Sequence, residues 1–154
     1  MTIAKFLKLN LVLVLMAAIL LSASACKKDK AQPELKPALQ GDWQELSLSA
    51  GMERLISFRS DKSFRMVLVS KIAPSIFIST YTGTYTLNND HVQVKLTDER
   101  VTKDNVLVST AAVNMNLYDK GTYKVEDNVL TLKYITYPAD APVNTEAKFK
   151  RRIE

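Results

Sequence analysis

The chain carries few side chains that could perform catalysis. His91 is the only histidine and Cys26 the only cysteine among 154 residues. General acid–base and nucleophilic catalysis usually need such a group beside a second one, or a pair of close carboxylates. His91 follows a predicted turn at Asn89-Asp90, where a solvated histidine is expected, and the carboxylates of Asp98-Glu99 are expected to be solvated rather than paired. We therefore expect that the protein is not an enzyme.

Metal and cofactor sites are not indicated by the residue types either. A zinc site needs several cysteine or histidine ligands, and the sequence offers one of each. The four glycines lie too far apart for a phosphate-binding loop; they are Gly41, Gly51, Gly83 and Gly121. We expect no metal and no cofactor.

Residues 1–25 have the pattern of a secretory signal peptide. Lys5 and Lys8 precede an unbroken run of eleven apolar residues, Leu11–Leu21, and small residues follow. A positive head, an apolar middle and a small-residue exit are typical of such a signal. As a helix the run would cover about 16 Å, roughly half of the hydrocarbon core of a bilayer, so a permanent membrane span is the weaker interpretation. We expect this segment to be cleaved.

The lone thiol stands where this segment ends. The stretch Ser24-Ala25-Cys26, with Leu21-Ser22-Ala23 before it, resembles the lipobox of bacterial lipoproteins. The resemblance implies that the Cys26 thiol is acylated with a diacylglycerol and that Cys26 becomes the first residue of the mature chain. The alternative is an ordinary cleavage site, which would leave an exported protein with one reactive thiol. We expect Cys26 to anchor the protein, since each buried CH₂ of an acyl chain contributes about 0.8 kcal/mol.

Residues 26–38 are expected to be the lipidated cysteine and a flexible linker. They are polar, are interrupted by Pro33 and Pro37 and lack apolar periodicity, which is typical of a tether. By resemblance, some gram-negative envelopes sort lipoproteins by charged residues directly after the cysteine, and Lys27-Lys28-Asp29 matches such signals in part. A linker without an address is the alternative. We expect a lipid-anchored protein of the cell envelope, with the outer membrane favoured and the leaflet left open.

The charge balance of the mature chain excludes a typical nucleic-acid-binding protein. Two of the 21 basic side chains lie within residues 1–25, so 19 remain beside 16 acidic ones. This excess is too small for a nucleic-acid signature. Residues 39–154 are numerous enough for one domain with one core and too few for two.

Residues 39–154 are expected to form an all-β domain. Short runs rich in Val, Ile, Thr, Tyr and Phe alternate with turn formers such as those of 98–105, and no stretch has a convincing helical stripe. Many strands at close spacing favour an antiparallel barrel or sandwich. The predicted strands are Trp43–Leu48, Arg54–Phe58, Ser63–Ser70, Ser75–Tyr81, Gly83–Leu87, Val92–Leu96, Val106–Leu117, Thr122–Val125, Val129–Tyr134 and Ala147–Ile153.

Two stretches, Gly83–Lys95 and Gly121–Lys133, align without a gap. Each predicts a hairpin with a two-residue turn, at Asn89-Asp90 and at Asp127-Asn128, because Asn and Asp tolerate positive φ. The expected facing pairs are Leu87 with Val92, Tyr85 with Val94, Val125 with Leu130 and Tyr123 with Leu132. These pairs place apolar side chains on one face, so one face of each hairpin is expected to be buried.

Three motifs in order resemble the lipocalin-like domains of bacterial lipoproteins. They are Gly41-Asp42-Trp43, the hairpin pattern Ile56–Phe64, and the Gly-Thr-Tyr hairpins that precede the basic last strand Phe149–Ile153. The similarity spans Leu39 to Glu154. It implies an antiparallel up-and-down barrel of about eight strands.

The resemblance also implies how one end of the barrel closes. In lipocalins an arginine of the last strand stacks across the tryptophan of the first strand, a cation–π contact of about 0.5–2 kcal/mol. We expect Arg151 over Trp43, with Arg152 as the alternative. Trp43 and Leu46 fall on opposite faces under strict alternation, so the first strand needs a bulge or Trp43 points away from the interior.

The resemblance implies that the barrel binds a small apolar or amphipathic molecule without catalysis. The alternative is a filled barrel that docks another envelope protein through its surface, since stretches such as Phe64–Val69 are apolar on both faces. A cavity of a few hundred Å³ would favour the first function. Alternation within Val106–Leu117 puts Leu107, Ala111, Val113, Met115 and Leu117 on one face. The candidate lining residues are Phe64, Met66, Leu68, Tyr85, Val94, Val113, Met115, Tyr123 and Leu132.

Overall fold

The computed structural model describes residues 38–152, which form nine β-strands and no helix. All strand pairs are antiparallel, so the all-β prediction is confirmed. The strands are β1 (Gly41–Glu45), β2 (Met52–Phe58), β3 (Ser63–Ile72), β4 (Ser75–Asn88), β5 (His91–Lys103), β6 (Val106–Leu117), β7 (Asp119–Glu126), β8 (Val129–Thr136) and β9 (Val143–Arg151). The predicted signal peptide, Cys26 and most of the predicted linker lie outside the described residues.

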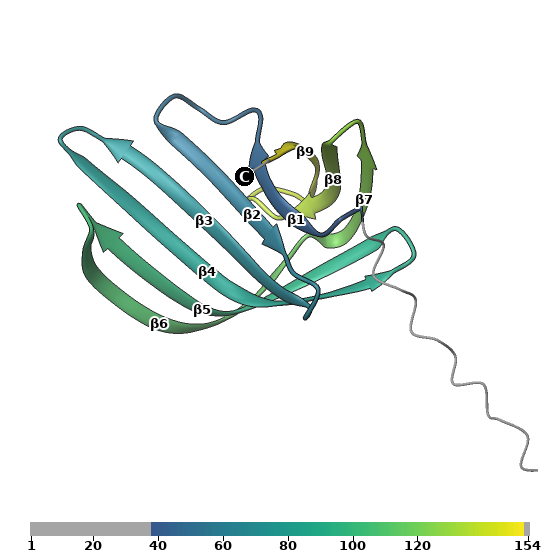
Figure 1. The fold of residues 1–154 in the computed structure, drawn as a ribbon, viewed down its shortest axis with the longest axis horizontal. Helices are drawn as coiled ribbons and strands as arrows, with labels where there is room; N and C mark the ends of the chain where they lie inside the picture. The colour runs from purple at the N-terminus through teal and green to yellow at the C-terminus, as the bar shows by residue number, and fades with distance from the viewer. Residues whose placement is uncertain (1–37, 153–154) are drawn as a thin grey trace, which may run out of the picture. The chain divides into compact units, whose positions relative to one another are not determined.

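Eight of the strands close into a barrel, which confirms the predicted architecture. The ring runs β1-β2-β3-β4-β5-β7-β8-β9 and returns to β1 (Figure 1). The β9–β1 closure pairs Trp43 with Arg151. The β5–β7 closure is short: His91 pairs with Thr122, and the Tyr123 amide donates to the Asp90 carbonyl at 2.8 Å. Within the described residues β6 pairs only with β5.

The two similar hairpins have the predicted register. Tyr85 faces Val94 and Leu87 faces Val92, while Tyr123 faces Leu132 and Val125 faces Leu130. The turns use positive φ, 57° at Asn89 in the first hairpin and 49° and 62° at Asp127-Asn128 in the second. Local turn chemistry and alternation are therefore sufficient to set these registers.

The barrel interior is a packed apolar core. We call the side of the sheet that faces this core the inner face and the opposite side the outer face. Phe58 contacts Phe64 and Tyr85 at ring centroid distances of 5.1 and 5.0 Å, and Tyr118 contacts Tyr134 at 5.0 Å. The buried side chains are Leu39, Trp43, Ile56, Phe58, Phe64, Met66, Tyr85, Val92, Val94, Leu96, Tyr118, Tyr123, Leu130, Leu132, Ala147 and Phe149.

Strands β3 to β6 continue beyond the barrel as a curved sheet (Figure 1). The segment predicted as a turn at 98–105 is strand up to Lys103, and the two predicted strands on either side of Thr82 are one strand, β4. Pairing across β4, β5 and β6 overrides the local turn signal of polar residues such as Asp98-Glu99. In β6 every side chain except Val113 and Leu117 is exposed.

Bulges change which side chains share a face. Val101 pairs with Ser109 but Thr102 pairs with Leu107, so Val108 is an extra residue in β6. Leu107 consequently lies on the face opposite Val113 and Met115, and the predicted common face was wrong because alternation does not continue through a bulge.

The first strand ends earlier than predicted. Trp43 is fully buried in the core. Strand β1 stops at Glu45, and Leu46 lies beyond it with 53% of its surface exposed. Strict alternation required either a bulge in this strand or a Trp43 side chain that points away from the interior. Because the strand ends before Leu46, neither is needed.

Candidate functional site

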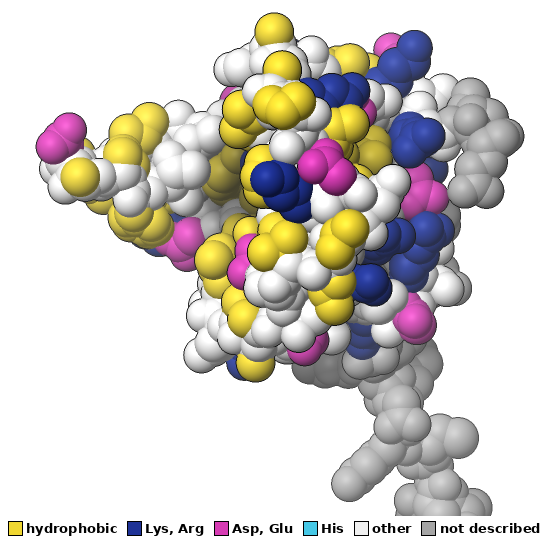
Figure 2. Space-filling model, turned by 90° about the vertical axis from the view of Figure 1, so that its left-hand side faces the viewer, with side chains coloured by type: hydrophobic (Ala, Val, Ile, Leu, Met, Phe, Trp, Pro, Cys, Tyr) yellow, Lys and Arg dark blue, Asp and Glu magenta, His cyan; other side chains and the backbone are white. Residues whose placement is uncertain are grey.

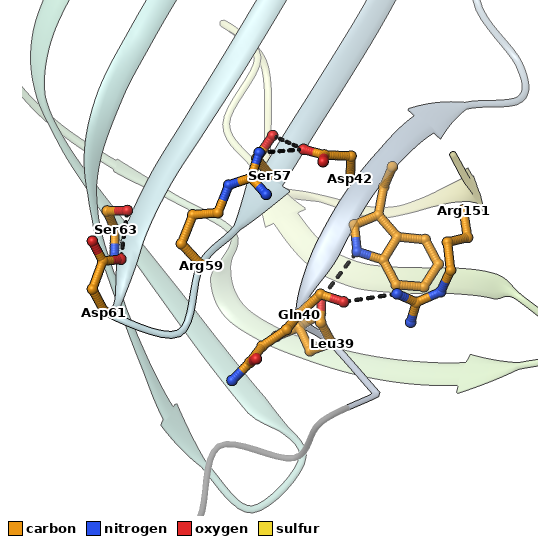
Figure 3. Close-up of polar contacts among 9 residues, drawn as sticks. Leu39, Gln40, Asp42, Ser57, Arg59, Asp61, Ser63 and Arg151 are labelled. Atoms are coloured by element: carbon orange, nitrogen blue, oxygen red, sulfur yellow. Dashed lines mark hydrogen bonds and ion pairs between the residues drawn. The ribbon is translucent and has the colours of Figure 1, made fainter. Parts of the chain in front are cut away.

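The closed end of the barrel is built around Trp43 and Arg151. The Arg151 guanidinium carbon lies 4.3 Å from the centre of the Trp43 ring. The same guanidinium donates to the carbonyls of Gln40 and Ala38 at 2.8 and 2.7 Å. The Trp43 indole donates to the Leu39 carbonyl at 2.9 Å (Figure 3). Arg151, not Arg152, therefore occupies the position that the resemblance implied.

The residues at this end of the barrel are closely packed and hydrogen-bonded. A Cβ on Gly41, whose φ is +129°, would lie 2.6 Å from a terminal nitrogen of Arg151. Beside it, one Asp42 carboxylate oxygen accepts hydrogen bonds from Ser57 at 2.5 Å and Arg59 at 2.9 Å (Figure 3). The polar groups at this end therefore bind one another and the backbone.

Most of the candidate lining residues fill the barrel. Six are buried in the core: Phe64, Met66, Tyr85, Val94, Tyr123 and Leu132. Leu68 and Val113 are partly buried and pack against that core, whereas Met115 is 47% exposed. The structure therefore brings eight of the nine together but does not bring in Met115.

Two hollows formed by described residues lie on the outer faces of the sheet. One of about 540 Å³ includes Lys120, Lys133 and Glu146 on β7 to β9. Another of about 480 Å³ lies over β4, β5 and β6 and includes Thr82, Asp98 and Thr110. Most of the residues that line them are polar or charged, unlike the apolar cavity expected for a lipocalin-type ligand.

A polar cluster lies on the inner face at the edge of the core. Arg54 donates to both carboxylate oxygens of Glu45 at 2.5 and 2.7 Å. Burial lowers the pKa of the Arg54 guanidinium, but the hydrogen bond to Glu45 and nearby charges outweigh this, and the net pKa is raised. The nearby Tyr118 hydroxyl is buried without a hydrogen-bond partner, and burial raises its pKa strongly. No sequence pattern pointed to Tyr118, because its burial depends on the corner between β6 and β7.

That corner has unusual backbone geometry. Tyr118 and Lys120 have φ values of 59° and 50°, and the Gly121 amide donates to the Tyr118 carbonyl at 2.7 Å. A Cβ on Gly121 would lie 2.5 Å from that carbonyl oxygen. The corner turns the chain from the extended sheet into the barrel and directs the Tyr118 ring into the core.

His91 lies away from this cluster. Its side chain is 58% exposed, and its Nε2 atom is 3.9 Å from an Asp90 carboxylate oxygen. Within residues 38–152 no three His, Cys, Asp or Glu side chains are grouped so that they could hold a metal ion.

An apolar surface occupies the far end of the extended sheet. We call the exposed side chains Ile72, Ile76, Val106, Leu107 and Val108 the distal patch; their exposed fractions run from 43% to 67%. The Asp104 backbone and carboxylate bind the Ile76 backbone at 2.9 Å, which joins the β3–β4 and β5–β6 tips. Figure 2 faces this end and shows hydrophobic side chains on a projecting arm and on the body across a hollow. Only the apolar character of both strand faces signalled this surface in the sequence.

Comparisons with protein-family models, with curated proteins and with solved structures found no match to this chain. The lipobox and lipocalin-like resemblances remain predictions that rest on the residues quoted for them. Among the described residues there is no helix with the length and apolarity needed to cross a membrane.

Proposed function

We propose that this protein is a non-catalytic interaction module of the cell envelope, anchored by lipid on Cys26, that docks another envelope protein through the distal patch. The main observation that supports this proposal is the exposure of the apolar side chains of the distal patch. Monomeric soluble proteins rarely expose contiguous apolar patches larger than a few hundred Å² unless the patch has a function.

The composition of the patch suits a protein surface. The apolar side chains are aliphatic and come from the tips of two hairpins, so a partner can bury them without entering the barrel. Nearby charges have partners within the chain: the Lys71 ammonium pairs with Glu53 at 2.5 Å, and Lys103 lies over the Phe77 ring at 5.5 Å. Burial of apolar surface contributes about 25 cal/mol per Å², and little unpaired charge opposes it here.

The test is site-specific photocrosslinking of the full-length protein in its native envelope. A photoreactive side chain at Ile76 is expected to yield a discrete adduct whose mass exceeds that of two chains. The matched control places the same side chain at Thr86, which is exposed on the outer face of the barrel part of β4. Equal labelling at both positions, or none at Ile76, would refute the docking function.

A second candidate function is the binding of a small apolar or amphipathic molecule. Two observations favour it: a set of half-buried side chains packs against the core on the inner face, and the buried Tyr118 hydroxyl has no hydrogen-bond partner. These side chains are Leu68, Tyr81, Val113, Leu117 and Tyr134. A ligand with a hydrogen-bond acceptor could satisfy that hydroxyl after a small rearrangement, and the apolar side chains would cover its remainder.

Native mass spectrometry of the gently extracted full-length protein separates the two functions. A ligand-binding protein is expected to carry a co-purified small molecule that is lost in Leu68→Arg and kept in Ile76→Lys. A docking module is expected to show no mass beyond that of its lipidated chains. A bound molecule that survives Leu68→Arg would argue against the inner face as its site.

A further inference from the structure

Strand β6 is a long free edge without charge. Its twelve residues, Val106–Leu117, include no Lys, Arg, Asp, Glu or Pro, although 24% of the whole chain is charged. Among the described residues it pairs with β5 alone, and it forms the outer border of the extended sheet (Figure 1). Within residues 38–152, one row of its backbone N–H and C=O groups therefore has no partner strand.

Such an edge normally invites pairing with another strand. Natural sheets block exposed edges with charged side chains, proline, short length or bulges. β6 has irregularities on either side of Ser109–Ala112, but within that segment the ladder with β5 is regular and the side chains are small and uncharged. Neighbouring β5, whose two edges are both paired, carries the charges instead, at Lys95, Asp98, Glu99, Arg100 and Lys103.

We propose that β6 pairs with β6 of a second copy of this chain, antiparallel and around a two-fold axis at Ala111. This proposal concerns the backbone edge and goes beyond the docking function. Pairing with a second copy gives the backbone groups of both free edges hydrogen-bond partners in one contact, because a two-fold axis brings the same surface of each chain together.

The side chains fit this pairing. A two-fold axis perpendicular to the sheet keeps the outer faces of both copies on the same side. With Ala111 facing its symmetry mate, Thr110 faces Ala112 and Ser109 faces Val113. No charged side chains oppose each other directly, and the small side chain of Ala112 borders the hollow of about 480 Å³ on the outer face.

The charges on the flanking strands are complementary in this register. Arg100 pairs with Thr110 and Asp98 pairs with Ala112 within one chain. Across the axis, Arg100 of each copy then shares a row with Asp98 of the other. Their backbones are about 14 Å apart, three strand spacings, and the long arginine side chain brings the opposite charges closer over Thr110 and Ala112.

Other charges do not oppose the association. On the inner face, Glu99 lies opposite Tyr81 of β4, and its carboxylate raises the pKa of the Tyr81 hydroxyl, so this carboxylate lies near β4. Residues 38–152 contain 15 basic and 13 acidic side chains, so repulsion between two copies is weak. These observations favour a second copy over a partner of strong charge.

The first test measures the molar mass of the full-length protein in mild detergent by light scattering. The natural chain is expected to be a dimer, and Thr110→Lys a monomer at the same concentration. Thr82→Lys is the matched control, because Thr82 is also an exposed threonine on the outer face and borders the same hollow, but β4 has no free edge there. A monomeric natural chain, or equal loss of the dimer in both variants, would overturn the proposal.

The second test crosslinks the axis. Paired residues of antiparallel strands have Cα atoms about 4.5–5.5 Å apart, within the range of a disulfide. Ala111→Cys is expected to form a disulfide-linked dimer under mild oxidation, with Thr82→Cys and the natural chain remaining unlinked. A linked dimer at both positions, or at neither, would contradict pairing at Ala111. Larger oligomers that Thr110→Lys leaves intact would indicate a different contact and reject the two-fold edge.

Discussion

The guanidinium of Arg151 joins the two ends of the described chain at a single point. It covers the Trp43 ring and binds the carbonyls of Ala38 and Gln40, which precede the first strand. The chain before β1 would otherwise leave these carbonyls unpaired near a buried aromatic ring. One side chain therefore completes the core and fixes the point at which the chain enters the barrel.

Arg151→Ala is expected to reduce the free energy of unfolding by about 2 kcal/mol, because it removes a cation–π contact and two charge-assisted hydrogen bonds. Arg152→Ala, at the exposed neighbouring position, should change it by less than about 0.5 kcal/mol. Urea denaturation of both variants measures the difference. Equal stability of the two would show that the Trp43 contact contributes nothing.

Tyr118 is a residue whose environment predicts a pH effect. Burial raises the pKa of its hydroxyl from the ordinary value of 10.0. The unfolded chain loses this proton near pH 10, whereas the folded chain retains it to higher pH. The free energy of unfolding therefore does not depend on the titration of this group below about pH 10. It falls as the pH rises toward the raised pKa, because deprotonation favours the unfolded chain.

Tyr118→Phe is expected to stabilise the fold by about 1 kcal/mol at neutral pH, because it removes a buried hydroxyl without a partner. The variant has no proton to lose at this position, so its advantage over the natural protein is expected to widen as the pH rises above about 10. Urea midpoints of both proteins, measured at neutral and at alkaline pH, give the sign and the size. Parallel pH profiles for the two proteins would contradict the burial of the Tyr118 hydroxyl.

At the scale of elements, glycine permits the close approach of β4 and β5 where the long hairpin bends. The register shifts between Thr82 and Gly83, and the extra residue on β5 is Thr97. A Cβ on Gly83 would lie 2.0 Å from the Lys95 carbonyl oxygen and 2.8 Å from the Leu96 Cα atom. The bend between the barrel and the extended sheet therefore requires a residue without a side chain.

Gly83→Ala is expected to lower the free energy of unfolding by about 3 kcal/mol, because the new methyl group must displace backbone atoms. Thr84→Ala, at the exposed next position, is the control and should cost less than about 1 kcal/mol. Thermal or urea unfolding measures both. A tolerated Gly83→Ala would show that β4 and β5 do not approach each other this closely.

At the scale of the whole molecule, the strands form two different regions, a barrel and an extended sheet. The barrel buries its apolar side chains in a filled core, while the continuations of β3 to β6 leave apolar side chains and one strand edge exposed. A protein held at a membrane by its leading end could present such a sheet to neighbours in the envelope. This arrangement unites the proposed anchor with the proposed docking surface.

Cys26→Ser is expected to release the full-length protein from membranes into the soluble fraction, because a serine hydroxyl does not replace the thiol as the site of acylation. Lys30→Ser, within the predicted linker, is the control and should leave the protein with the membranes. Fractionation followed by immunodetection measures both. Retention of Cys26→Ser in washed membranes would exclude the lipid anchor as the sole attachment.

The sequence alone determined the features that depend on neighbours along the chain. The resemblance of three motifs to lipocalin-like domains implied the barrel and the contact between Trp43 and Arg151, two residues far apart in the chain. Alternation and Asn/Asp turns set the registers of the two similar hairpins. These registers follow from local conformational preference and from which face of a strand is apolar.

Only the tertiary structure decided how the apolar residues are used. Phe64 and Leu132 became core and Met115 became surface, although their sequence patterns are alike. The bulges, the corner at Tyr118 and the free edge of β6 depend on which strands lie side by side, and burial is a property of that arrangement. Alternation specifies which side chains share a face, but the packing of distant strands determines whether another layer covers it.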